Sequence, residues 1–144
     1  MNGNNNILEI VDLKVEYHTD DAVIHAVNGV NLNVKEGETI GLVGETGAGK
    51  TTIARSVLRI LQSPPAKVCG WKIIFEGRDI MTLSEKEMRK IRGNKISMIF
   101  QDPMTALNPI ERVGDQIAEA IKLHGKYSRI QAMERAREML EMVG

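Results

Sequence analysis

Hydrophobic and polar residues alternate along the start of the chain, with the period of two that is typical of a half-buried strand. The alternation runs from Ile7 to Tyr17, and a second extended run covers Val23 to Val34, with an interruption at Asn28-Gly29. Because a polar turn separates the two runs, we expect them to form an antiparallel pair of strands. The side chains expected on one face of the first strand are Val11, Leu13, Val15 and Tyr17.

Later apolar runs are bounded by turn residues or by helix caps and predict shorter elements. Ser84 with Glu87, and Ser128 with Gln131, have the spacing of a capping box at a helix start. The expected strands are Thr39–Val43, Trp71–Phe75 and Ile96–Phe100, and the expected helices are Thr51–Leu61, Ser84–Arg92, Val113–His124 and the segment from Ser128 onward. The methionines expected to fill the core beside the last helix are Met133, Met139 and Met142.

The charge, the cysteine count and the lengths of the apolar runs limit the kinds of partner and compartment that we expect for this chain. Lys and Arg total 19, as do Asp and Glu, so the formal net charge is zero, and no net field favours nucleic acid or an anionic membrane surface. The single cysteine, Cys69, excludes an internal disulfide framework, and we expect it to be a packing residue in a reducing compartment. Since no apolar run is long enough to span a membrane, we expect a cytoplasmic chain whose membrane role comes only through a partner.

The glycine-rich stretch from Gly44 to Thr52 lies between an expected strand and an expected helix, which is the context of a phosphate-binding loop. Its glycines allow successive N–H groups to point into one concavity, where the start of the helix also attracts anions. Lys50 supplies a mobile charge for the outer phosphates, and the Thr51 hydroxyl can ligate Mg²⁺. The competing interpretation is an ordinary glycine turn. A dinucleotide fingerprint fits less well, because its glycine spacing differs and it has no lysine.

Nucleotide hydrolysis also needs a carboxylate for Mg²⁺ and a group that orients the attacking water. Asp102 is the local candidate for the carboxylate, because it follows the apolar run at residues 96–100. A magnesium aspartate usually follows directly on such a strand, whereas here Gln101 intervenes and Pro103 follows. The guanine-specifying Asn-Lys-x-Asp pattern is not completed at Asn94-Lys95-Ile96-Ser97, which argues against a GTPase.

Two motifs in this order, Gly44–Thr51 and Met98–Pro103, resemble the nucleotide-binding subunit of an ATP-binding-cassette (ABC) transporter. Three more stretches, Phe75–Ile80, Ile91–Ile96 and Met104–Pro109, are similar to the oligopeptide, dipeptide and nickel importer branch of that family. The resemblance implies an α/β P-loop fold of the ABC class, with a partial RecA-like core, antiparallel strands at its N-terminal end and the start of a helical subdomain.

The resemblance also implies roles for individual residues. Gln101 matches a glutamine that touches Mg²⁺ and the attacking water, so that Asp102 belongs to the glutamine loop and is not the magnesium carboxylate. Tyr17 matches an adenine-stacking aromatic residue, although a tyrosine at a strand end is by itself more typical of packing. Catalytic roles are implied for Lys50 and Gln101, and magnesium contacts for Thr51 and Gln101. The implied nucleotide-binding residues are Tyr17, Gly44, Glu45, Thr46, Gly47, Ala48, Gly49, Lys50, Thr51 and Thr52.

The same resemblance predicts the organisation of the chain and its partners. Residues 1–112 are expected to be the front of the ATP-binding core and residues 113–144 the start of the helical subdomain. The chain is expected to be the front half of a cassette, because it reaches Gly144 before the family's signature motif. The implied cofactors are ATP and Mg²⁺, and the implied partners are permease subunits and a second nucleotide-binding subunit at the cytoplasmic face of the membrane. An alternative function is a nucleotide-binding module without turnover.

Overall fold

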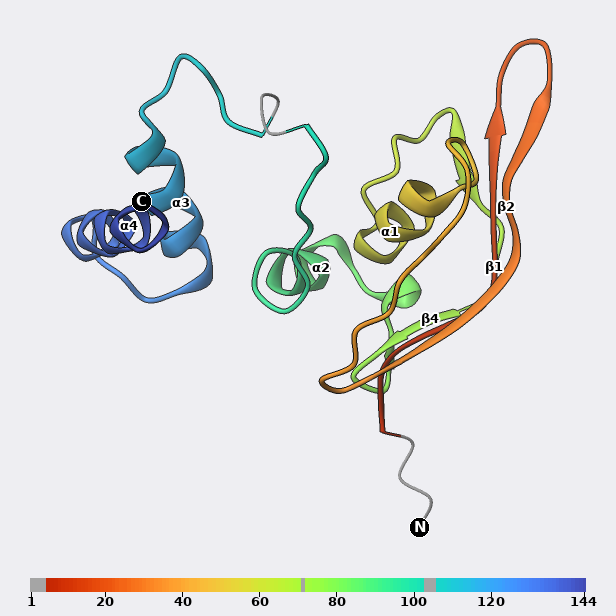
Figure 1. The fold of residues 1–144 in the computed structure, drawn as a ribbon, viewed down its shortest axis with the longest axis horizontal. Helices are drawn as coiled ribbons and strands as arrows, with labels where there is room; N and C mark the ends of the chain where they lie inside the picture. Colours follow the sequence, from red (N-terminus) through yellow and green to blue (C-terminus); the bar gives the residue numbers. More distant parts are fainter. Residues whose placement is uncertain (1–4, 71, 103–105) are drawn as a thin grey trace. The chain divides into compact units, whose positions relative to one another are not determined.

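The computed structural model describes residues 5–70, 72–102 and 106–144, which form two compact units divided between Met88 and Arg89. Trp71, the expected first residue of the strand at 71–75, and part of the motif at 104–109 lie outside these residues. The division expected at residue 112 stays a prediction. The elements, drawn in Figure 1, are β1 Asn6–His18, β2 Val23–Lys35, α1 Lys50–Leu58, β3 Ala66–Val68, β4 Lys72–Phe75, β5 Arg78–Asp79, the 3-10 helix η1 Ile80–Thr82, α2 Glu85–Ile91, α3 Val113–His124 and α4 Arg129–Val143.

A sheet with β1 at its centre organises the first unit. The strand order is β2-β1-β4-β5, and β3 pairs with the remaining part of β1. Every one of these ladders is antiparallel, and the red and orange ribbons of β1 and β2 run side by side in Figure 1. The predicted antiparallel pair is therefore confirmed, and β2 continues through Asn28-Gly29 with shifts of register.

The alternation of β1 breaks at Asp12. This residue has a positive φ of 48°, and the β1–β2 register shifts between Ile10 and Leu13, as at a β-bulge. A bulge moves the residues before it to the opposite face, so Ile10 is buried with Leu13 while Val11 is 39% exposed. The prediction that Val11 shares the buried face of Leu13 was wrong for this reason.

Helix α1 packs its buried side chains against the sheet and ends earlier than the sequence predicts. Arg59 caps it in the left-handed region, with φ 52°, and the Arg59 guanidinium donates to the carbonyl oxygens of Ile80 and Leu83 at 3.1 and 2.6 Å. These bonds join the end of α1 to the segment around η1. The buried residues of α1 are Ile53, Ser56, Val57 and Leu58.

Both predicted capping boxes are confirmed. At the start of α2 the Ser84 amide donates to the Glu87 carboxylate at 3.0 Å, and the Glu87 amide donates to the Ser84 hydroxyl at 3.4 Å. At the start of α4 the reciprocal bonds join Ser128 and Gln131 at 2.9 and 3.3 Å. These side chains satisfy amides that have no partner inside their helices.

The prediction of two of the strands was wrong. Neither residues 39–43 nor residues 96–100 form a strand, and Val43 and Ile99 are each 98% exposed. An isolated strand leaves its N–H and C=O groups unpaired. The named strands in the described part of the chain pair only with one another, in antiparallel order. Residues 39–43 join none of these ladders, and residues 96–100 make only an isolated bridge between Ile96 and Arg92.

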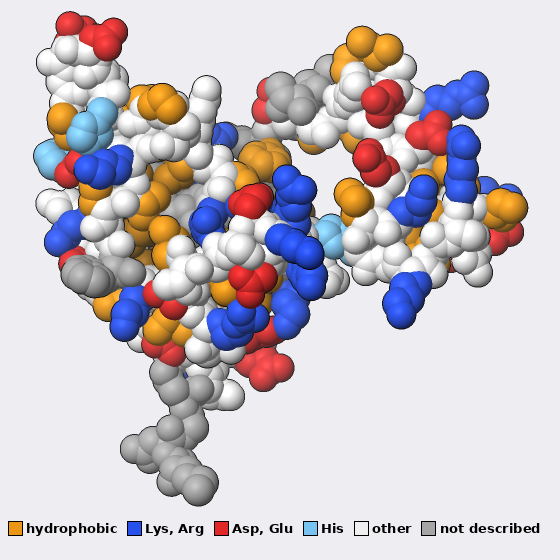
Figure 2. Space-filling view, turned by 180° about the vertical axis from the view of Figure 1, so that it is seen from behind, with side chains coloured by type: hydrophobic (Ala, Val, Ile, Leu, Met, Phe, Trp, Pro, Cys, Tyr) orange, Lys and Arg blue, Asp and Glu red, His pale blue; other side chains and the backbone are white. Residues whose placement is uncertain are grey.

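Helices α3 and α4 form a close pair in the second unit, drawn in blue in Figure 1. Small side chains make their shared core, with Ile117 and Ile121 packed against it. The methionines predicted to fill the core are instead 38–67% exposed, because the alanines occupy the facing positions. Apolar side chains reach the surface in both units (Figure 2). The buried residues at this helix pair are Ala118, Ala132 and Ala136.

Cys69 is exposed, so the expectation that it is a packing residue was wrong. It lies just after β3, where its amide donates to the Lys14 carbonyl oxygen at 2.8 Å. Its backbone is thus fixed by β1 while its side chain faces solvent. Among the helices that the structure describes, none combines the length and the apolar character needed to cross a membrane.

Candidate functional site

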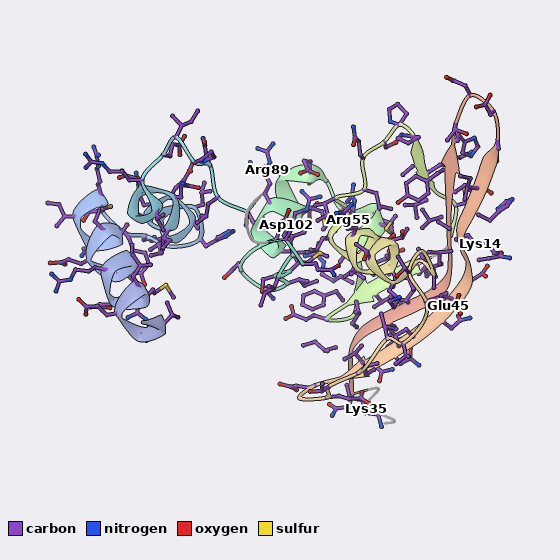
Figure 3. The ribbon with its side chains drawn as sticks, turned by 45° about the horizontal axis from the view of Figure 1, so that its top comes forward. Lys14, Lys35, Glu45, Arg55, Arg89 and Asp102 are labelled. Carbon is purple, nitrogen blue, oxygen red and sulfur yellow. The ribbon has the colours of Figure 1, made fainter. Side chains whose placement is uncertain are left out.

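Two of the three glycines in the loop take the left-handed backbone conformation that favours glycine, whereas Gly44 is not among the positive-φ glycines. Gly47 and Gly49 have positive φ angles of 86° and 80°, in a region that side chains with a Cβ rarely adopt. Gly49 is the cap residue of α1, so the loop runs directly into the positive end of the helix. Figure 3 shows Glu45 on this loop and Arg55 on the helix that follows.

Gly49 is also required by close packing. A Cβ at this position would lie 2.4 Å from the carbonyl oxygen of Ala26 and 3.3 Å from Cγ2 of Val27. Both neighbours belong to β2, so the end of the loop rests directly on the sheet. At Gly47, in contrast, a Cβ would meet nothing within 4 Å. The loop is therefore held at one end and open at its turn.

The side chain of Lys50 is hydrogen-bonded to the backbone of the loop itself. Its ammonium donates to the carbonyl oxygens of Gly44 and Glu45, at 2.6 and 2.7 Å. An ammonium has three N–H donors, so one of them is left for another acceptor. Lys50 is the first residue of α1, and its side chain therefore carries a positive charge back to the first residues of the loop.

The start of α1 is suited to an anion. No side chain among the described residues caps it, and its first turn contains no acidic side chain. The amides of the first helical turn have no acceptor inside the helix, and the helix dipole adds positive charge there. Uncapped amides, an open glycine turn and Lys50 together fit a chain of phosphates.

Thr51 fits one part of a magnesium site. The residue is exposed in the first turn of α1, and a hydroxyl oxygen is the hard ligand that Mg²⁺ prefers. Within residues 5–70, 72–102 and 106–144, no group of three or more His, Cys, Asp or Glu side chains could hold a metal ion. The part of the chain that the structure describes thus offers the hydroxyl contact without a cluster of carboxylates.

Tyr17 lies beside the phosphate loop, as an adenine contact requires. Its hydroxyl is 3.5 Å from Oγ1 of Thr52, at the long end of the hydrogen-bonding range. Tyr17 belongs to β1 and is partly buried, so its backbone is fixed while part of its ring is accessible. Sequence reasoning did not predict the contact with Thr52, because the two residues are 35 positions apart.

Gln101 and Asp102 belong to the second unit, where both are exposed in the bend that follows the apolar run. The residues of the phosphate loop and Tyr17 belong to the first unit. The structure thus brings together Tyr17 and the loop within one unit. The roles of Gln101 toward Mg²⁺ and the attacking water remain predictions.

Comparison with known proteins gives the family. A family model described as ABC transporter matches residues 27–144. A probable peptide ABC transporter ATP-binding protein, y4tR, of Sinorhizobium fredii is 50% identical over 95% of this chain. The oligopeptide transport ATP-binding protein OppD of Bacillus subtilis is 44% identical over 96% of it. This chain spans 41% and 38% of the lengths of these two relatives.

Solved structures agree with this assignment. The ATP-binding cassette MJ0796, as a dimer in a post-hydrolysis state bound to ADP and Pi, superposes with a TM-score of 0.79 at 26% identity. The superposition covers 94% of this chain and 56% of that one, so the α/β fold expected from the sequence is confirmed. Because the family model matches most of its residues, this chain belongs to the ABC transporter family.

Proposed function

We propose that this chain is the ATP-binding part of an ABC importer subunit. In the assembled transporter it would bind and hydrolyse Mg-ATP to energise uptake of peptides, or of a related solute such as nickel. The observation that carries the proposal is the phosphate loop, which combines a helix start that no described side chain caps with the Lys50 ammonium held against Gly44 and Glu45. The names of the relatives y4tR and OppD support the peptide branch.

Each residue of the loop has a proposed task. The amides from Gly47 to Thr52 and the ammonium of Lys50 hold the phosphates, because charge-assisted hydrogen bonds to phosphate are strong. The Thr51 hydroxyl ligates Mg²⁺, which neutralises charge on the phosphates when it is bound. Tyr17 stacks on the adenine through its ring.

We propose that further contacts come from the second unit and from partners. Gln101 would orient the attacking water and touch the metal. A second nucleotide-binding subunit and permease subunits would complete the transporter at the cytoplasmic face of the membrane. The dimeric state of the MJ0796 cassette supports the first of these partners.

The 144-residue chain alone should bind Mg-ATP without turning it over. It supplies the loop, Lys50, Thr51 and Gln101, whereas phosphoryl transfer needs complete positioning and charge stabilisation. Its sequence contains no Leu-Ser-Gly-Gly-Gln segment. Phosphate release by the purified chain should equal that of Lys50→Ala. Steady Mg²⁺-dependent release that Lys50→Ala abolishes would contradict this proposal.

The importer role can be tested in the source organism. Deletion of the reading frame that encodes these residues should abolish growth on an oligopeptide that supplies a required amino acid. The unmodified frame should restore growth, and the same frame with Lys50→Ala should not, because phosphate binding is lost. Lys35→Ala is the control, since Lys35 is an exposed lysine at the end of β2, outside the loop. Normal peptide uptake in the deletion strain would refute the role in peptide import.

A further inference from the structure

The side chains of Tyr17 and Thr52 meet between the two ends of the proposed nucleotide site, at the outer limit of hydrogen-bonding distance. The Tyr17 hydroxyl on β1 and the Thr52 hydroxyl on α1 are 3.5 Å apart in a partly buried setting. One residue is the proposed base contact and the other belongs to the phosphate loop. The contact between these two hydroxyls therefore helps to set the distance between the proposed adenine site and the phosphate loop.

The backbones on both sides of this contact are fixed. Tyr17 lies in the central strand, where it pairs with Ile24 of β2 and with Ala66 of β3. On the helix, the Thr52 carbonyl oxygen accepts a hydrogen bond from the Ser56 hydroxyl at 2.7 Å, and Ser56 is only 1% exposed. A rotation of the Tyr17 side chain is therefore the main movement left between the two anchors.

The start of α1 contacts both strands. Gly49 is the cap residue of α1, and Thr52 lies in its first turn. Gly49 rests against Ala26 of β2, while Thr52 meets Tyr17 of β1. Two contacts on neighbouring strands limit how α1 can turn about its axis, so the Thr52 hydroxyl stays within reach of the Tyr17 hydroxyl.

We propose that Thr52 is a positioning residue that holds the ring of Tyr17 for the base. The Thr52 hydroxyl restrains the two side-chain torsions of the tyrosine, so the ring is ordered before nucleotide binds. The consequence is selectivity for a nucleoside triphosphate over a triphosphate that has no base. This inference rests on the proposed function, because it assumes that ATP is the ligand.

The test compares Mg-ATP with Mg-tripolyphosphate as ligands of the folded 144-residue chain. The unmodified chain should bind ATP more tightly. Thr52→Val and Tyr17→Phe should each reduce the ratio of the two affinities by about two- to tenfold, the effect of one neutral hydrogen bond. The double variant should lose no more than either single variant, because both remove the same bond. Thr52→Ser, which keeps the hydroxyl, should restore the ratio.

Two controls separate positioning from damage to the fold. Circular dichroism should give the same spectrum for every variant, and Tyr127→Phe, an exposed tyrosine of the second unit, should leave the ratio unchanged. If Thr52→Val weakens both ligands equally, Thr52 contacts phosphate only and the positioning role is overturned. If the unmodified chain binds neither ligand, the proposed function fails, and this inference fails with it.

Discussion

Replacement of Gly49 by alanine tests the way in which the phosphate loop is seated on the sheet. The added Cβ meets two obstacles. The backbone has φ 80°, and the new atom would lie 2.4 Å from the Ala26 carbonyl oxygen. The obstructing atom belongs to the backbone of β2, which cannot turn aside as a flexible side chain can.

The magnitude follows from these two terms. Holding an alanine in the left-handed region costs about 1–2 kcal/mol, and moving packed backbone to admit a methyl group costs about 1–3 kcal/mol. The free energy of unfolding should therefore fall by about 2–5 kcal/mol in Gly49→Ala. Gly37→Ala is the matched control, because Gly37 has φ 73° but nothing lies within 4 Å of its added Cβ. In Gly37→Ala the free energy of unfolding should fall by only about 1–2 kcal/mol, which is what the left-handed backbone costs an alanine.

Urea denaturation followed by circular dichroism measures the free energy of unfolding of both variants. The slope of that free energy with urea concentration should be similar for the two. Titration with Mg-ATP provides a second reading, in which Gly49→Ala binds more weakly than Gly37→Ala because its loop is displaced. Equal loss of stability in the two variants would refute the close contact between the loop and β2.

Three other changes probe the fold and its electrostatics. Arg59→Met should reduce the free energy of unfolding by about 1.5–3 kcal/mol, because two backbone carbonyls lose a charged donor; Arg55→Met, at an exposed position of the same helix, should be near neutral. Ser128→Ala should cost about 1 kcal/mol, measured as the stability of α4 by hydrogen exchange, and unchanged protection there would contradict the capping role. Hydrogen bonds from Ser84 lower the pKa of Glu87, so this carboxylate stabilises the fold above its unfolded-state pKa and the contribution disappears as the pH falls through the folded-state pKa. An NMR titration of Ser84→Ala should show the Glu87 pKa move upward, and an unchanged midpoint would exclude the Ser84 hydroxyl as a cause.

Local signals predicted much of this fold. The serine caps at residues 84 and 128 were confirmed because a capping box depends only on residues three apart. The pairing of β1 with β2 was confirmed because a short polar turn leaves neighbouring strands few alternatives. The left-handed backbone of Gly47 and Gly49 was predictable for the same reason, since a positive φ is a local demand of the backbone.

Features that depend on distant neighbours were not predictable. The apolar runs at 39–43 and 96–100 have the composition of strands, but a strand also requires a partner for its backbone. The bulge at Asp12 reverses the face of Val11 without any mark in the alternation. The contact between Tyr17 and Thr52 depends on the rotation of α1 about its axis. The spacing of hydrophobic residues along the sequence does not determine that rotation.

The central claim is that Lys50 and its loop bind the phosphates of ATP. Isothermal titration with Mg-ATP should show that Lys50→Ala weakens binding by about 1.5–3 kcal/mol, the scale of a charge-assisted hydrogen bond, which is about ten- to 150-fold in Kd. Lys35→Ala, at an exposed lysine outside the loop, should bind as the unmodified chain does. Equal Mg-ATP affinities for folded Lys50→Ala and Lys35→Ala would contradict the account.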